Sequence, residues 1–348
     1  MALNNPFTLS FGKSPNEIVS RYEYAEEILG TFRSSNPVSN AYLIEGIRGC
    51  GKTVLMTLIE KELLKEKDWI VVDLNSTQDL LSDFAMRLLD SCKKISDVLK
   101  KGFNLSVAGF GVGLNGENQS RDSVSIITEI LETLKKKHKR VLITIDEVMN
   151  GDNMRHFASE FQIFLRKDYP VFLLMTGLYE NIYAIQNDPA LTFLLRTPKM
   201  NLEPLSLLQI SKAYQKVFDT DIEFAKKLAR ITKGYAFAFQ ALGLLYYDFR
   251  NSLSLEEIIL KFDDLLDDFV YRKIWQGLSE QDRKVILAIS DSKTKVTDIC
   301  QKMNMTSSTF SKYRERLISR GLIQSGQHGY VELILPRFAE VASFYAEE

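Results

Sequence analysis

Residues 46–53 read Gly-Ile-Arg-Gly-Cys-Gly-Lys-Thr and fit the pattern GxxxxGK followed by Ser or Thr in full. The apolar run Ala41–Glu45 precedes them and the apolar-periodic segment Thr53–Lys65 follows, which predicts a strand, a loop and a helix in that order. Glycines allow consecutive backbone N–H groups to turn toward phosphate oxygens, and the helix N-terminus adds the positive end of its dipole. The stretch therefore predicts a phosphate-binding loop.

Such a loop predicts a bound nucleotide and a magnesium ion. Lys52 would reach the β- and γ-phosphates of ATP, and the hydroxyl of Thr53 would be a Mg²⁺ ligand. Cys50 would contribute through its backbone N–H. A glycine turn that fits the pattern by chance is the alternative, and the strand and helix on its two sides argue against it. The predicted nucleotide-binding residues are Gly46, Ile47, Arg48, Gly49, Cys50, Gly51, Lys52 and Thr53.

An apolar strand that ends in two carboxylates supplies the second part of the predicted site. It reads Val-Leu-Ile-Thr-Ile-Asp-Glu over residues 141–147. Asp146 would hold Mg²⁺, directly or through water, opposite Thr53, and Glu147 would orient or deprotonate the attacking water. Two acids in the turn after a strand are common by themselves. Downstream of a phosphate loop they indicate a hydrolytic site.

Two further residues complete the predicted site, each with an ordinary structural alternative. Thr176 ends the apolar strand Val171–Thr176, where its hydroxyl could sense the γ-phosphate or position water. A threonine in a strand-end turn needs no such role. Arg196 directly precedes the strand Thr197–Leu202, at a rim where a neighbouring subunit's nucleotide could lie, which makes it a candidate arginine finger. A plain surface arginine is the alternative.

Apolar runs and amphipathic segments alternate through the first two hundred residues, the pattern of an α/β domain with a mainly parallel sheet. Strands are predicted at Ala41–Glu45, Trp69–Leu74, Val141–Asp146, Val171–Thr176 and Thr197–Leu202. Helices are predicted at Thr53–Lys65, Leu80–Lys94, Val124–Lys137 and Met154–Arg166. The glycine-bearing segment Phe103–Asn115 predicts an inserted β-hairpin, either a structural flap or a contact with a partner subunit or DNA.

The signals for strands stop at Ser206, which predicts an all-helical lid. Its helices are expected at Leu207–Phe218, Ile222–Thr232, Ala236–Phe249 and Leu255–Trp275. After that the sequence changes again, to short helices followed by a β-type segment. The predicted organisation is a P-loop ATPase domain at 1–205, a lid at 206–276 and a third domain at 277–348.

The third domain reads as a winged helix-turn-helix. Helices at Leu278–Ser290, Val296–Met303 and Thr306–Arg320 precede a β-hairpin around Gly326–Gly329. Residues 283–320 contain nine Lys or Arg against three Asp or Glu, and the outward face of the last helix would meet the major groove or its phosphates. Winged helices also dock proteins or act as passive lids, which stays the alternative. The candidate DNA-binding residues are Ser308, Thr309, Lys312 and Arg316.

Composition restricts the remaining possibilities. The chain has 348 residues, of which 45% are hydrophobic and 26% charged, and a formal net charge of −1. These values are typical of a folded protein of two or three domains without a global signature of nucleic-acid binding. The three cysteines and three histidines are scattered, which argues against a zinc site or a disulfide framework. No signal peptide or bilayer-length apolar run is evident, so we expect a cytoplasmic protein without membrane contact.

Taken together, these motifs resemble the AAA+ ATPases, and within them the branch of origin-recognition and archaeal replication initiators and STAND signalling NTPases. The chain is also similar to a bacterial and archaeal family known only as ATP-binding proteins, through Asn5–Arg21, Gly234–Gln240, Arg314–Ile323 and Gly329–Val331. The resemblance implies that the first stretch wraps over the adenine, with Arg21 as its contact.

One departure from the initiators concerns the lid. Initiator-type members carry a γ-phosphate-contacting arginine shortly after the lid glycine. Here Ala236, Phe237 and Ala238 occupy that stretch. The resemblance therefore implies slow turnover or a switch-like use of ATP.

Two functions of different classes follow. The first is a Mg²⁺-dependent ATPase that acts as a nucleotide-controlled switch, forms a homo-oligomer and docks on double-stranded DNA through its winged helix. The second is a STAND-like signalling or defence NTPase whose C-terminal domain binds a protein partner; the missing lid arginine favours it, whereas the lack of a repeat array and an effector domain does not. A small-molecule kinase would share only the phosphate loop, and Glu147 suits hydrolysis instead.

Overall fold

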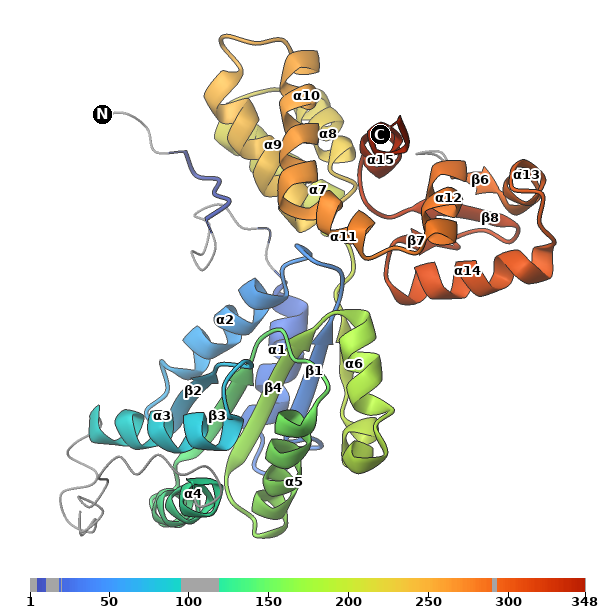
Figure 1. Ribbon diagram of the computed structural model, residues 1–348. Coiled ribbons are helices and arrows are strands. Elements are labelled where there is room, and N and C mark those ends of the chain that lie inside the picture. The colour runs from blue at the N-terminus through green and yellow to red at the C-terminus, as the bar shows by residue number, and fades with distance from the viewer. Residues whose placement is uncertain (1–4, 11–18, 20, 95–118, 290–292, 348) are drawn as a thin grey trace. The chain divides into compact units, whose positions relative to one another are not determined.

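A computed structural model describes residues 5–10, 19, 21–94, 119–289 and 293–347 (Figure 1). The chain falls into two compact units. The sheet unit comprises Tyr22–Glu45 and Lys52–Asn201, and the lid unit comprises Met1–Arg21, Gly46–Gly51 and Leu202–Glu348. The hairpin predicted at Phe103–Asn115 lies outside the described residues.

The sheet unit is built on a parallel sheet with the strand order β2-β3-β4-β1-β5. Two of the predicted strands have the predicted bounds and the other three differ by one or two residues at their ends. Register pairs Glu45 with Gly177 and Ile145 with Met175, so β4 ends between the ends of β1 and β3. The strands are β1 (Ala41–Glu45), β2 (Trp69–Leu74), β3 (Arg140–Ile145), β4 (Val171–Gly177) and β5 (Lys199–Asn201).

Helices cover both faces of this sheet because successive strand residues point to opposite sides. On one face, alternate residues of the strands join the buried core formed with α3, α4 and α5. On the other face, Phe32 of α1 packs on Tyr42 and Phe172, with ring centroids 5.7 and 5.1 Å apart. The helical elements are α1 (Tyr22–Arg33), α2 (Lys52–Leu63), α3 (Leu80–Lys94), α4 (Gln119–Lys136), α5 (Asp152–Arg166), α6 (Tyr179–Gln186) and the 3₁₀ segment η2 (Pro189–Arg196).

Four helices form the lid, with side-chain caps from Ser206, Asp221 and Ser254 at three of their N-termini. Phe7 packs into their core, with its ring 5.5 Å from Phe239. The single helix predicted at Leu255–Trp275 is wrong, because a π-helical turn interrupts it. The elements are α7 (Leu207–Phe218), α8 (Ile222–Ile231), α9 (Ala236–Phe249), α10 (Leu255–Leu266), the π-turn η3 (Asp267–Tyr271) and α11 (Arg272–Gln276).

The C-terminal elements include every helix and both hairpin strands that the sequence predicted there. Ser279 and Thr306 cap their helices as expected. A short strand and a last helix were not predicted, and the antiparallel sheet has the order β6-β8-β7. The elements are α12 (Glu280–Ala288), β6 (Thr294–Lys295), α13 (Val296–Lys302), α14 (Ser307–Ser319), β7 (Ile323–Gln324), β8 (Tyr330–Leu333) and α15 (Phe338–Glu347).

The π-turn is the place where the C-terminal elements attach to the lid helices. The Tyr271 hydroxyl donates to the Pro336 carbonyl at 2.6 Å, and the Tyr345 hydroxyl donates to Asp267. Arg337 adds a bidentate ion pair with Asp263 of α10. These contacts make one unit of lid and C-terminal elements and explain the interrupted helix, since a π-turn changes the angular position of the residues that follow. The division into three domains stays a prediction.

No helix among the described residues has the length and the apolar character that a bilayer crossing requires.

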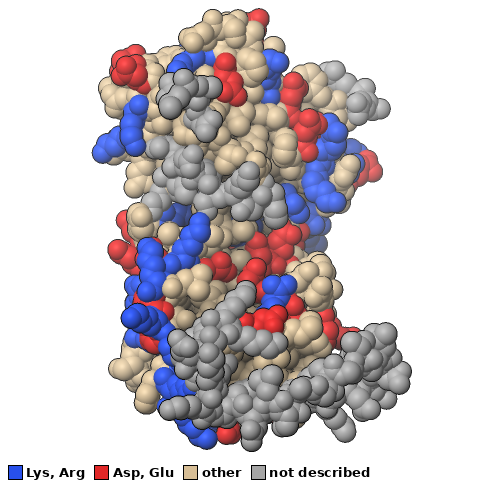
Figure 2. Space-filling view, turned by 90° about the vertical axis from the view of Figure 1, so that its left-hand side faces the viewer, with Lys and Arg blue, Asp and Glu red and all other residues tan. Residues whose placement is uncertain are grey.

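On the face shown in Figure 2, basic and acidic side chains are interspersed, and neither the positive nor the negative charges form one large patch.

Candidate functional site

Three of the predicted site residues form one hydrogen-bonded group in the sheet unit. The hydroxyl of Thr53, in the first turn of α2, donates to Asp146 with an Oγ1–Oδ2 distance of 2.7 Å. The hydroxyl of Thr176, near the end of β4, donates to the other carboxylate oxygen of Asp146. Because β4 lies between β1 and β3, the strand order itself brings both threonines to the carboxylate that follows β3.

Glu147 occupies a strained turn directly after Asp146. Its φ is 52°, in the left-handed region that residues other than glycine rarely adopt. Its N–H donates to Asp146 Oδ1 at 3.0 Å, which holds the turn. The side chain is exposed, and within the described part of the chain its carboxylate has no hydrogen-bond or ion-pair partner. Backbone strain of this kind clusters at functional sites, and an unengaged carboxylate here suits a general base.

The surroundings of Asp146 are acidic. Burial raises the pKa of Glu60, on α2, and the negative charges of Asp73 and Asp146 raise it further, although a hydrogen bond from Thr144 acts in the opposite direction. A divalent cation beside Asp146 would offset this repulsion, and Thr53 and Asp146 offer the oxygen ligands that Mg²⁺ prefers. Among the described residues no three His, Cys, Asp or Glu side chains form a group that could hold a metal. Mg²⁺ fits such a sparse site because it keeps waters and takes phosphate oxygens as ligands.

The phosphate loop has the backbone that its glycines predict. Gly49 and Gly51 have φ angles of 73° and 96°, which other residues adopt only with strain. Lys52 follows as the first residue of α2 and is 8% exposed. The Cys50 side chain is buried, and its backbone N–H donates to the Ile47 carbonyl at 3.4 Å; its contribution to phosphate binding stays a prediction. Arg21 donates to the Cys50 carbonyl at 3.0 Å, so in this structure it supports the loop; its predicted contact with adenine stays a prediction.

Thr176 and Arg196 are placed differently from each other. The Thr176 side chain has no exposed surface and its hydroxyl donates to Asp146; its predicted part in sensing the γ-phosphate or positioning water stays a prediction. The Thr176 hydroxyl also lies 3.4 Å from the backbone nitrogen of Glu147, so its contacts connect Asp146 with the turn of Glu147. Arg196 is exposed at the end of η2, and the described residues offer its guanidinium no partner. Its role as an arginine finger stays a prediction.

Three of the four candidate DNA-binding residues are exposed on α14, and the fourth is engaged by another side chain; DNA contact itself stays a prediction. Ser308, Thr309 and Lys312 are exposed, while Phe310 and Leu317 are buried as expected. Arg316, however, does not present a free guanidinium. It donates to Asp282 of α12 at 2.6 and 3.0 Å, and the Asp282 side chain is only 2% exposed. A buried carboxylate is stabilised by a positively charged partner, and Arg316 of α14 is that partner for Asp282 in the first turn of α12.

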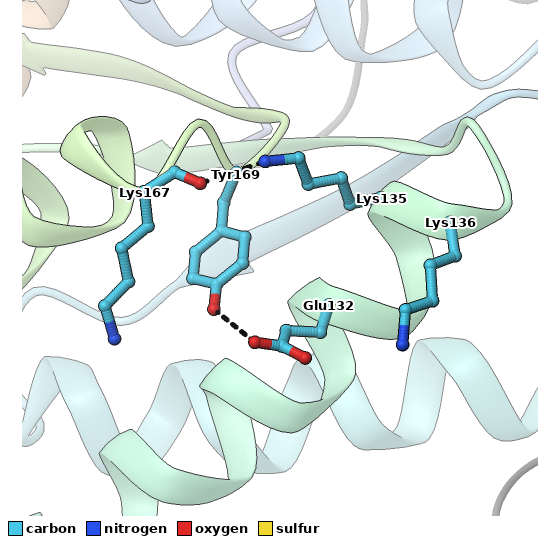
Figure 3. A pocket seen from close by; sticks show the side chains of 5 residues that line it. All are labelled: Glu132, Lys135, Lys136, Lys167 and Tyr169. Carbon is cyan, nitrogen blue, oxygen red and sulfur yellow. Dashed lines mark hydrogen bonds between the residues drawn. The ribbon is translucent and has the colours of Figure 1, made fainter.

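A hollow of about 480 Å³ lies in the sheet unit, where α4 ends and the chain enters β4 (Figure 3). Three lysines line it, yet its polar groups bond mainly to one another. The Tyr169 hydroxyl donates to Glu132 at 3.2 Å, and Lys135 donates to the Lys167 carbonyl at 3.0 Å. Because it opens at the start of β4, and Thr176 is at the end of that strand, this hollow is separate from the Asp146 group.

Comparison with solved structures gives the fold. A Walker-type ATPase of Pyrococcus abyssi is 12% identical, with a TM-score of 0.68 over 97% of this chain and 99% of that one. The ORC2 protein of Aeropyrum pernix, solved as ADPNP–ADP complexes, is 14% identical with a TM-score of 0.62 over 97% and 96% of the two chains. Cdc6p from Pyrobaculum aerophilum is 14% identical with a TM-score of 0.50, over 97% of both.

Comparison by sequence adds one match. Residues 268–341 match a domain of unknown function, DUF8462. Curated protein sequences gave no match. The structural likenesses nevertheless show the fold: the chain has the architecture of the Walker-type ATPase, ORC2 and Cdc6p structures, in agreement with the fold class that the motifs of the sequence predicted.

Proposed function

We propose that this protein is a Mg²⁺-dependent ATPase whose bound nucleotide sets the state of its lid and C-terminal elements. The observation that carries the proposal is the bonding of Thr53 and Thr176 to Asp146, beside the exposed carboxylate of Glu147. A hydroxyl and a carboxylate within 2.7 Å of each other, directly after a phosphate loop, are the oxygen ligands that P-loop enzymes use for Mg²⁺.

Each residue has a separate task in ATP hydrolysis. Lys52 would bind the β- and γ-phosphates, and Thr53 and Asp146 would hold Mg²⁺, which supplies charge neutralisation on those phosphates. Glu147 would orient a water for attack on the γ-phosphorus and accept its proton. The bond from the γ-phosphorus to the bridging oxygen breaks, and ADP and phosphate leave. Thr176 would keep Asp146 and the Glu147 turn in place.

The binding step can be tested by titration calorimetry of the full chain with ATP and with ADP. We expect saturable binding in Mg²⁺, and weaker binding when EDTA removes the metal, because Thr53 and Asp146 then contribute no metal-mediated contact. The absence of a heat of binding for Mg-ATP at millimolar concentration would reject the proposal.

A connected set of contacts in the lid unit supports the switch. The backbone N–H of Phe237 donates to the Gly49 carbonyl of the phosphate loop at 3.0 Å. The Phe237 ring packs on Phe269 of the π-turn, with centroids 5.8 Å apart. In the same turn, Tyr271 donates to Pro336 of the C-terminal elements. A change in the phosphate loop can therefore reach the C-terminal elements through this series of contacts.

DNA is the partner that the C-terminal elements fit best. Their first three helices and the hairpin follow the order of a winged helix-turn-helix, and the exposed start of α14 carries Ser308, Thr309 and Lys312. Lys293, Lys295 and Lys312 are exposed, and the described residues give none of them an ion-pair partner.

Two alanine variants one turn apart on α14 separate DNA contact from folding. Lys312→Ala should weaken binding to long duplex DNA irrespective of its sequence, and should lower the slope of log affinity against log salt by about one. Arg316→Ala should lower the melting temperature, because the buried carboxylate of Asp282 would lose its ion-pair partner and retain only the hydrogen bond from Ser279. That cost should stay below the roughly 3–5 kcal/mol of a fully buried pair, since Arg316 is 45% exposed. Gel shifts and thermal melts measure the two effects; an unaltered salt slope in Lys312→Ala would remove that residue from the interface.

A protein partner is the second candidate, and a specific observation favours it. Many basic side chains of the C-terminal elements are engaged inside the protein: Arg283 with Trp275, Arg314 with Ser325, Arg316 with Asp282 and Arg320 with Gly277. The basic surface that the C-terminal elements offer to DNA is therefore smaller than the sequence suggested. Nucleotide-dependent capture of a defined protein, without a gel shift on duplex DNA at low salt, would favour this STAND-like function.

Arg196 is exposed and unpaired among the described residues. In a homo-oligomer that binds either DNA or a protein, it would complete the nucleotide site of the neighbouring subunit.

A further inference from the structure

The lid approaches the phosphate loop at the place where initiator-type ATPases carry an arginine. Instead of that arginine, Tyr235 donates from its hydroxyl to the Arg48 carbonyl at 2.6 Å. The N–H of Phe237, in the first turn of α9, donates to the Gly49 carbonyl at 3.0 Å. Tyr235 is 4% exposed, and burial raises its pKa well above the ordinary value, so the hydroxyl keeps its proton and remains a donor at physiological pH.

These bonds determine which way the loop's peptide groups face. A peptide unit is planar and trans, so its N–H points opposite to its C=O. With the Arg48 carbonyl held by Tyr235, the N–H of Gly49 is directed away from the lid. With the Cys50 carbonyl held by Arg21 at 3.0 Å, the N–H of Gly51 is likewise directed away from Arg21. Main-chain N–H groups turned in this way are what a phosphate loop uses to bind phosphate oxygens.

The fit between Tyr235 and the loop is close. A Cβ atom added to Gly49 would lie 2.3 Å from the Tyr235 hydroxyl oxygen, well inside any real contact distance. Gly49 is one of the unspecified positions of the GxxxxGK pattern, so the phosphate-loop motif alone does not require glycine there. Its left-handed φ of 73° and the nearby hydroxyl together account for this glycine.

We propose that Tyr235 is a positioning residue for nucleotide binding, which holds the phosphate loop from the lid side in a chain that lacks the lid arginine. The inference rests on the proposed function, because it gives Tyr235 a role in the same nucleotide site. The lid thereby acts on the loop's backbone, through the carbonyl groups of Arg48 and Gly49.

Tyr235→Phe tests the proposal, because it removes the hydroxyl and retains the ring. Tyr214→Phe is the matched control: Tyr214 is fully buried in the same lid, and its hydroxyl also donates to a main-chain carbonyl, that of Phe239, at 2.7 Å. Both variants lose one buried hydrogen bond and should melt at lower temperatures. Only Tyr235→Phe should raise the Kd for Mg-ATP, by about tenfold, which matches the loss of one such bond at the loop. Its kcat at saturating ATP should change less than twofold.

The controls distinguish failure of the inference from failure of the proposed function. If the wild-type protein binds Mg-ATP and Lys52→Ala does not, the site is established, and an unchanged Kd in Tyr235→Phe then overturns the inference alone. An equal increase of Kd in Tyr214→Phe also overturns it, because the effect would come from general loosening of the lid. If the wild-type protein itself fails to bind Mg-ATP, the proposed function fails and the inference falls with it.

Discussion

Glu147→Gln is expected to slow ATP hydrolysis by about 10²–10⁴-fold, the usual contribution of a general base, and to leave Mg-ATP binding unchanged. The carboxylate is exposed next to Asp146 and is unengaged among the described residues, so its removal breaks no structural contact. The glutamine side chain has nearly the same shape and accepts a hydrogen bond, yet it cannot take a proton from water. The φ of 52° belongs to the backbone turn, which the amide of residue 147 maintains through its bond to Asp146.

Phosphate release under single-turnover conditions measures the rate, and calorimetry measures the binding. Glu129→Gln is the matched control, since Glu129 is an exposed glutamate on α4, outside the Asp146 group. It should hydrolyse ATP at the wild-type rate. A wild-type rate in Glu147→Gln would show that another group activates the water. A loss of binding would instead show that this turn contributes to the nucleotide site itself.

The sequence predicts well those parts of the fold that depend on the local pattern of apolar and polar residues. Ala41–Glu45 and Trp69–Leu74 are short apolar runs between polar residues, and the strands have those bounds. The helix α1 was not among the predicted elements, although its buried positions, Ala25, Ile28, Leu29 and Phe32, follow helical spacing. The π-turn at Asp267–Tyr271 has no comparable signal, because its extra residue is stabilised by contacts with residues more than sixty positions away.

The candidate site likewise has a part that the sequence predicts and a part that depends on contacts between distant residues. The phosphate loop and the Asp146–Glu147 pair were visible as motifs, because the chemistry requires those residue types at fixed positions. What Thr176 does could not be deduced, since a strand pattern does not say whether a terminal hydroxyl is exposed or bonded to a neighbouring strand's carboxylate. Arg316 looked like a free cation because Asp282, its partner, is 34 positions distant in sequence. The contact of Tyr235 with the loop could not be predicted for a similar reason, because the Arg48 carbonyl that it holds lies 187 positions earlier in the sequence.

Lys52→Ala is expected to weaken Mg-ATP binding by about 100-fold, and hydrolysis at sub-saturating ATP should fall with it. A charge-assisted hydrogen bond contributes about 1.5–3 kcal/mol, and Lys52 is the residue of the loop motif that is proposed to bring a positive charge to the β- and γ-phosphates. The fold should tolerate the change, because alanine is the best helix former and residue 52 is the first residue of α2.

Lys65→Ala removes the same charge a few residues beyond the end of α2, where the ammonium is 67% exposed and pairs with Glu62. Its Kd for Mg-ATP should match the wild type, which separates loss of a phosphate ligand from loss of net charge. Lys52→Arg sharpens the comparison: it keeps the charge but replaces a compact ammonium by a planar guanidinium at a position only 8% exposed. If contact geometry matters more than charge, Lys52→Arg should bind nearly as poorly as Lys52→Ala. Wild-type affinity in Lys52→Ala would mean that the backbone amides of the loop hold the phosphates without the lysine.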